Sequence, residues 1–166
     1  MDYPGGLLQR LGELPPGPWP GQVFRWTFEG IPPDRPNARG ARWNPPAVVA
    51  LYTGLSRDVV KAESQYLIDA QGFPPTRGRI MHTLAISLNS VLDITNPKLL
   101  GELGVTPEAL QSTDHTACQM VGGAVERLGH DGLLVPSARG AANNLVIYVN
   151  NLPYDTPITV LASEPF

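Results

Sequence analysis

The chain has 166 residues, of which 42% are hydrophobic and 16% are charged, so it is long enough to bury the core of one domain. Its formal net charge of −3 does not supply the basic surface that direct nucleic-acid binding requires. One cysteine cannot form an internal disulfide, and neither a signal-peptide pattern nor an apolar run of about 20 residues is present, so we expect a cytoplasmic protein without a membrane segment.

The N-terminal sequence predicts a leader followed by a strand. Residues 1–20 are rich in proline and glycine, and we expect them to form a leader with one short helical turn. Residues 21–166 would then form a single domain. In the stretch QVFRWTFE, aromatic residues alternate with polar ones, so the pattern predicts a strand with Arg25 on the face opposite the aromatic side chains.

The sequence after residue 46 predicts strands with helices inserted between them. This irregular alternation favours an α+β fold, with one twisted, mostly antiparallel mixed sheet. In chain order we expect a strand over 47–53, a helix over 57–71 capped by Ser56, a strand over 79–88 continued or joined by 92–95, two short helices near 97–103 and from 107, a longer helix over 115–128 capped by Asp114, and strands over 132–136, 144–150 and 158–163.

Glu63 lies in the middle of the apolar stripe of the helix expected over 57–71. A carboxylate in such a position is costly unless it has partners or faces a cavity. A buried ion pair with an arginine and exposure at the surface are the alternatives, and we favour a glutamate that faces a cleft. The stripe consists of Val59, Val60, Glu63, Tyr66, Leu67 and Ala70.

Three arginines are candidate ligands for an anion. Arg25, Arg39 and Arg42 each offer planar, paired donors that suit phosphate oxygens, although any one of them could instead pair with a surface carboxylate. Trp43 and Tyr52 flank the Pro-Pro corner that follows Arg42. Their rings could stack on a flat ligand or pack at the rim of the core.

The stretch GLLVPSARGAANNLVIYV places polar side chains in a loop between two apolar strands. Ser137 opens this loop and Asn144 closes it, and the small residues between them would let backbone amides approach a ligand. An ordinary strand connection explains the stretch equally well. Cys118 and His82 have the pattern of core residues, and no residues have metal-ligand spacing, so we expect no metal.

Taken in order, these segments resemble the RES domain, a family of bacterial toxins named for an arginine, a glutamate and a serine. By this resemblance Glu63 and Ser137 are two of the naming residues, and either Arg25 or Arg42 is the third. The sequence departs from the family at YTG, where members often have Tyr-Thr-Ser. The segments that carry the resemblance are VFRW, GARWNPP, ALYTG, the Glu63 helix, LDIT and GLLVPSARGAANNLVIYV.

The resemblance implies a fold similar to that of ADP-ribosyltransferase toxins and an enzyme that destroys NAD⁺. The nicotinamide–ribose bond would be cleaved with either water or phosphate as the acceptor, without a cofactor. Glu63 would stabilise the positive charge that develops on the ribose, with Arg42 and Tyr52 as its catalytic partners. The residues expected to bind NAD⁺ are Arg25, Trp43, Ser137 and Asn144.

The resemblance also implies a partner. This would be an antitoxin with an Xre-type helix-turn-helix domain that covers the active site, and that complex, rather than this chain, would bind operator DNA. Family members tend to form pairs of identical chains, so this chain could also form a homodimer. Two other functions stay open as well: an ADP-ribosyltransferase that modifies a protein, and a catalytically inactive nucleotide-binding module.

Overall fold

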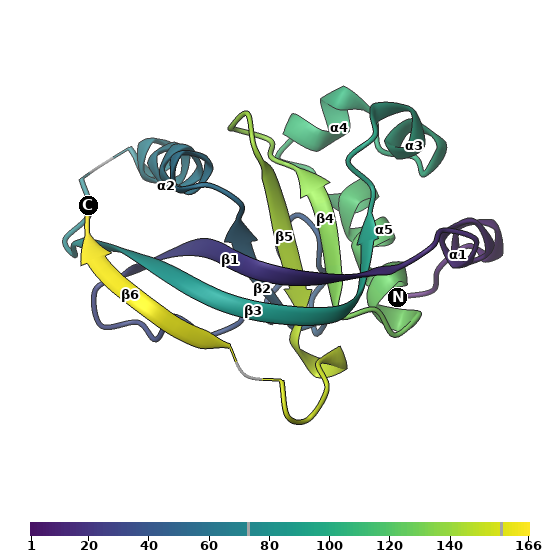
Figure 1. The fold of residues 1–166 in the computed structure, drawn as a ribbon. Coiled ribbons are helices and arrows are strands. Elements are labelled where there is room, and N and C mark those ends of the chain that lie inside the picture. Colours follow the sequence, from purple (N-terminus) through teal and green to yellow (C-terminus); the bar gives the residue numbers. More distant parts are fainter. Residues whose placement is uncertain (73, 157) are drawn as a thin grey trace.

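The computed structural model describes residues 1–72, 74–156 and 158–166. Its longest strands, β1 (Gly17–Phe28) and β3 (Arg79–Asp93), pair antiparallel along almost their whole length. β6 (Thr159–Pro165) runs antiparallel along the other side of β3. These strands form one long, curved layer (Figure 1).

A second group of strands crosses this layer (Figure 1). It consists of β2 (Ala50–Gly54), β5 (Asn143–Tyr148) and β4 (Gly132–Pro136), each antiparallel to the next. β4 runs parallel to the end of β3, and β2 meets β1 at a single residue pair. The six strands therefore form one mixed sheet in the order β1-β2-β5-β4-β3-β6, which the additional pairing of β1 with β3 closes on itself. The predicted α+β fold with a mostly antiparallel sheet is confirmed.

Local sequence signals explain where the helices begin and end. Ser56 Oγ accepts a hydrogen bond from the backbone of Val59 and starts α2 (Arg57–Gln71), which ends where Gly72 adopts a φ of 75°. Asn96 and Thr106 cap the two short helices α3 (Pro97–Glu102) and α4 (Pro107–Gln111) in the same way. The next helix, α5 (Thr116–Arg127), begins two residues after the cap predicted at Asp114, and η1 (Val149–Asn151) is a single 3-10 turn.

Two packed clusters lie on either side of β4 and β5. One joins β5 to β3 and β1 and includes Val23, Leu84, Leu145 and Ile147. The other lies under the helices, where α5 covers the opposite face. Its buried members are Leu11, Trp43, Ala50, Leu92, Ile94, Leu100, Leu103, Val105, Cys118, Val121, Ala124, Val125, Leu133, Val135, Val146 and Tyr148.

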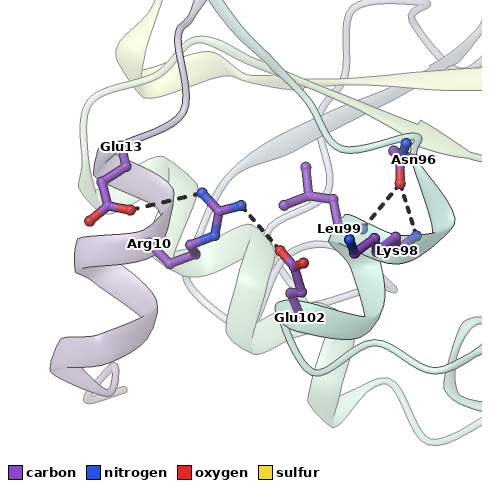
Figure 2. Close-up of polar contacts among 6 residues, drawn as sticks. All are labelled: Arg10, Glu13, Asn96, Lys98, Leu99 and Glu102. Atoms are coloured by element: carbon purple, nitrogen blue, oxygen red, sulfur yellow. Dashed lines mark hydrogen bonds and ion pairs between the residues drawn. The ribbon is translucent and has the colours of Figure 1, made fainter.

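The N-terminal residues are integrated into this second cluster. The predicted helical turn is α1 (Gly5–Gly12), and its Leu11 is fully buried. Arg10 binds Glu102 of α3 at 3.1 Å and Glu13 at 3.9 Å (Figure 2). Because β1 begins at Gly17, the boundary expected at residue 20 lies inside a strand. Residues 1–20 therefore contribute both a helix and part of β1 to the domain.

The inward face of α2 is shorter than its sequence pattern predicts. Val59 and Val60 are buried against β1 and β3, as expected. Tyr66 and Leu67 of the same apolar stripe are 40% and 51% exposed, so the stripe is not buried along its whole length. The buried side chains of α2 all lie between Val59 and Ser64, because only this part of the helix packs on the sheet.

Candidate active site

The Glu63 carboxylate is held by one side chain from the loop after β4 and one from the start of β5. Ser137 Oγ and Asn144 Nδ2 each donate a hydrogen bond of 2.6 Å to Glu63 Oε1. Ser137 Oγ in turn accepts hydrogen bonds from the backbone amides of Arg139 and Gly140, at 3.1 and 3.0 Å. Bonds to a carboxylate are the stronger kind of hydrogen bond, so one oxygen of Glu63 is fixed in place.

The same glutamate lines a cavity of about 60 Å³ between α2, β1 and β2. Arg25, Tyr52 and the aromatic residues Phe24 and Trp26 also line this cavity. Glu63 is half-buried rather than on the outer surface. The favoured interpretation of the sequence, a glutamate facing a cleft, describes this geometry better than the buried ion pair or the free surface position.

Two glycines allow α2 to approach the cavity closely. A Cβ at Gly54 would lie 2.6 Å from Val59 and 2.7 Å from Val60, and a Cβ at Gly140 would lie 2.5 Å from Val59. Any larger residue at either position would push the first turn of α2 outward and move Glu63 away from its partners. The glycine of the YTG motif is therefore a packing requirement in this chain.

Two hydrogen bonds fix the hydroxyl group of Tyr52. The hydroxyl accepts a hydrogen bond of 2.8 Å from the backbone of Trp43 and donates one of 2.6 Å to Asn44 Oδ1. Burial raises the pKa of Tyr52, so its phenol stays protonated at neutral pH. Since the hydroxyl already donates and accepts, the ring is the part of Tyr52 left to contact a ligand.

Arg25 reaches the cavity but is also a structural anchor. Its three guanidinium nitrogens donate to the carbonyl oxygens of Pro33, Tyr52 and Arg35, at 2.9, 3.1 and 2.9 Å. Burial lowers the pKa of Arg25 to about 10, which leaves it charged at neutral pH. Arg25 thus holds the loop after β1 against β2 and places a positive charge beside the cavity.

Arg42 extends toward the turn between α4 and α5. Its Nη1 donates to the carbonyl oxygen of Ser112 at 3.1 Å. The corner that carries Arg42 is bound tightly to α5, since Gln119 Nε2 donates to the Ala41 carbonyl at 2.9 Å. The absence of a side chain at Gly122 allows this contact, because a Cβ there would lie 1.9 Å from the carbonyl oxygen of Trp43.

Comparison with known proteins identifies the family. The family model for the RES domain matches residues 19–162. The chain belongs to the RES domain family. Glu63 and Ser137, the glutamate and serine expected to give the family its name, are thus joined by a direct hydrogen bond in this member.

The relatives of this RES chain include proteins that carry the name of an enzyme. This chain is 29% identical over 153 residues to proteins named NAD(+) phosphorylase MbcT in Mycobacterium bovis and in strains of Mycobacterium tuberculosis. The match covers 86% of this chain and 81% of the relative. The fold of this chain matches the crystal structure of the M. tuberculosis MbcT–MbcA toxin–antitoxin complex with a TM-score of 0.89. That match covers 99% of this chain and 94% of the other, at 24% identity.

One expected ligand of this RES domain is corrected by the structure. The indole of Trp43 is only 2% exposed and packs in the cluster under the helices, so it is not available to stack on a substrate. The sequence did not reveal this, because the burial depends on α5 and Gly122 closing over the corner. The neighbouring Asn44, fully buried beside Tyr52, is the positioning residue that sequence reasoning missed.

The residues set aside in the sequence behave as core residues. Cys118 is fully buried, and His82 bonds to Thr27 Oγ1 at 2.8 Å and to Ser163 Oγ at 2.7 Å. The described residues contain no group of three potential side-chain ligands for a metal ion. None of their helices is long and apolar enough to cross a membrane.

A larger hollow lies elsewhere, between α4 and α5. It measures about 520 Å³ and is open to solvent, and the carboxylates of Glu108 and Asp114 line it. Two carboxylates do not favour an anionic dinucleotide. We therefore take the Glu63 cavity, which Arg25 also lines, as the candidate active site in preference to this larger hollow.

Proposed function

We propose that this chain is the NAD⁺-degrading toxin of a toxin–antitoxin pair, and that it transfers ADP-ribose from nicotinamide to inorganic phosphate. The resemblance to the NAD(+) phosphorylase MbcT supports this reaction class. The observation that carries the proposal is the Glu63 carboxylate, fixed by Ser137 and Asn144 at a cavity that Arg25 and Tyr52 also line.

In this reaction Glu63 stabilises the sugar as the bond breaks. The nicotinamide of NAD⁺ leaves with the electron pair of the ribose C1–N bond, so positive charge develops on the ribose ring. A carboxylate held in position stabilises that charge without reorganisation of solvent. The hydrogen bonds from Ser137 and Asn144 direct Glu63 Oε1, which leaves Oε2 to face the ribose.

The neighbouring residues bind the rest of NAD⁺. The cavity of about 60 Å³ is smaller than NAD⁺, so the dinucleotide lies over its mouth with only the reacting end inserted. The ring of Tyr52 contacts the nicotinamide end, since its hydroxyl is already engaged. Arg42 and Arg25 supply positive charge for the diphosphate. Arg42 is the better candidate for a direct diphosphate ligand, because all three guanidinium nitrogens of Arg25 already donate to backbone carbonyl oxygens.

The partner is an antitoxin that blocks this site. A related fold has been solved as a complex of toxin MbcT with antitoxin MbcA. We propose an antitoxin of the Xre helix-turn-helix type, which alone would contact DNA, since this chain carries a net charge of −3. A homodimer of this chain and a cytoplasmic location, where NAD⁺ is available, belong to the same proposal.

The test is NAD⁺ consumption by purified, antitoxin-free protein, with and without phosphate. Rapid loss of NAD⁺ only when phosphate is present, with free nicotinamide and a phosphorylated ADP-ribose as products, supports phosphorolysis. Loss at the same rate in both buffers would assign hydrolysis. Label from NAD⁺ that ends up on protein would assign an ADP-ribosyltransferase, and no loss by folded protein would leave a binding module.

A further inference from the structure

We propose that Arg139 and His115, together with Arg42, form a site for a phosphate group beside the Glu63 cavity. The inference rests on the proposed function, because it assigns residues to a substrate of that reaction. The phosphate group could come from inorganic phosphate or from the diphosphate of NAD⁺, and the test below separates these sources.

The two guanidinium groups converge on one turn of the chain. Arg42 Nη1 donates to the carbonyl oxygen of Ser112 at 3.1 Å, and Arg139 Nη2 donates to the carbonyl oxygen of Gln111 at 3.3 Å. Gln111 and Ser112 are consecutive, so the two positive heads are neighbours although their residues lie 97 positions apart in the sequence, 139 − 42. His115 follows three residues later and is half-buried, as are both arginines.

In the described part of the chain, no carboxylate forms an ion pair with either of these arginines. Neither Arg42 nor Arg139 has a carboxylate within ion-pair distance among the described residues, whereas Arg10 and Arg57 do. The nearby carboxylate of Asp114 instead accepts hydrogen bonds from the amide and hydroxyl of Thr116. Two adjacent cations without a counter-ion repel each other, and an anion between them removes that cost.

His115 lies within the field of both arginines. Burial lowers the pKa of His115, Arg42 and Arg139 lower it further, and the Asp114 carboxylate acts in the opposite direction, so the net shift is downward. At neutral pH the imidazole is therefore neutral and offers one N–H donor, which suits a phosphate oxygen. The two hydrogen-bonded arginine heads define the site, and the lowered pKa of His115 agrees with its place beside them.

Arg139 is also held at the mouth of the active site. Its guanidinium lies 3.6 Å from the centre of the Tyr66 ring, one helical turn after Glu63 on α2. Its backbone amide donates to the Ser137 Oγ that binds Glu63. Phosphate bound here would lie beside the ribose. One of its oxygens would form the new bond to ribose C1 as the C1–N bond breaks, nicotinamide would leave neutral with that electron pair, and the phosphate proton would pass to water.

The experiment compares Arg139→Gln and His115→Gln with the control Arg127→Gln. Arg127 is exposed at the opposite end of α5, so its replacement makes the same change in net charge as Arg139→Gln but far from the site. The KM for phosphate and the KM for NAD⁺ are measured separately. Binding of inorganic phosphate to the antitoxin-free protein is measured in parallel by calorimetry.

For the first two variants we expect the KM for phosphate to rise about tenfold or more, with weaker phosphate binding and little change in the control. A rise in the KM for NAD⁺ instead would still assign a phosphate site, but to the diphosphate. Both KM values and phosphate affinity within about twofold of wild type would overturn the proposal. If the wild type binds phosphate but does not consume NAD⁺, the proposed reaction fails and the site stands.

Discussion

Ser137 and Glu63 are separated by 74 positions in the sequence, yet Ser137 Oγ lies 2.6 Å from Glu63 Oε1. The serine belongs to the loop between β4 and β5, and the glutamate belongs to α2. Their contact fixes the carboxylate of Glu63, a residue that lines the cavity between α2, β1 and β2, and Asn144 adds a second hydrogen bond to the same oxygen. The chemistry proposed for this chain depends on this arrangement.

Replacing Glu63 with glutamine is expected to abolish NAD⁺ consumption. Glutamine keeps the shape of the side chain but carries no negative charge to stabilise the developing cation, so we expect kcat to fall by about 100-fold or more. The melting temperature should change little. The control is Glu29→Gln, an exposed residue outside the cavity, and full activity in Glu63→Gln would contradict the proposed role.

Removing either partner of Glu63 is expected to have a smaller effect. In Ser137→Ala or Asn144→Ala the carboxylate loses one of two hydrogen bonds, each worth about 1.5–3 kcal/mol to a charged group, so kcat should fall roughly 10- to 100-fold. Because both bonds direct the same oxygen, the double variant should be non-additive. Steady-state kinetics on all three variants measures the coupling, and strictly additive losses would show that the two residues act independently.

The stability of the domain is expected to depend on Leu11. Leu11→Ala leaves a cavity in the cluster under the helices, and we expect a loss of about 2–5 kcal/mol in the free energy of unfolding. Arg10→Ala in the same helix removes only exposed ion pairs and should cost less than about 1 kcal/mol. Denaturant unfolding compares the two. Equal, small effects would mean that α1 is dispensable, as expected of a leader.

Stability is expected to fall as the pH falls through about 6.5. Burial is the main cause that lowers the pKa of His82, His115 and His130 below the ordinary histidine value of 6.5. As the pH falls, the unfolded chain therefore binds protons before the folded chain does, and acidification lowers the free energy of unfolding. This loss ends once the pH is below the pKa values of the folded protein. Above about pH 7.5 these histidines do not make the free energy of unfolding depend on pH. Denaturant unfolding from pH 8 to 5.5 measures this, and His82→Gln should reduce the slope. A flat profile would contradict the assignment.

Much of the fold could be predicted from local patterns. The strand that carries Arg25, the cap at Ser56 and the helix end at Gly72 all appear in the structure as expected. The sequence also placed Glu63 among apolar residues, which singled it out as a functional candidate. These features depend on residues within a few positions of one another, so one stretch of sequence contains the whole signal.

Other features were decided only by tertiary contacts. Trp43 was expected to bind substrate. Because Gly122 has no side chain, the backbone at Trp43 packs directly against α5, and the indole is buried. The pairing of Arg139 with Arg42 around one turn has no counterpart in any local pattern. The sequence by itself therefore determined which residue types and which elements are present, since caps and periodicity act over short range. Which side chains meet was decided by the pairing of β2, β5 and β4, because that register brings distant segments together at Glu63.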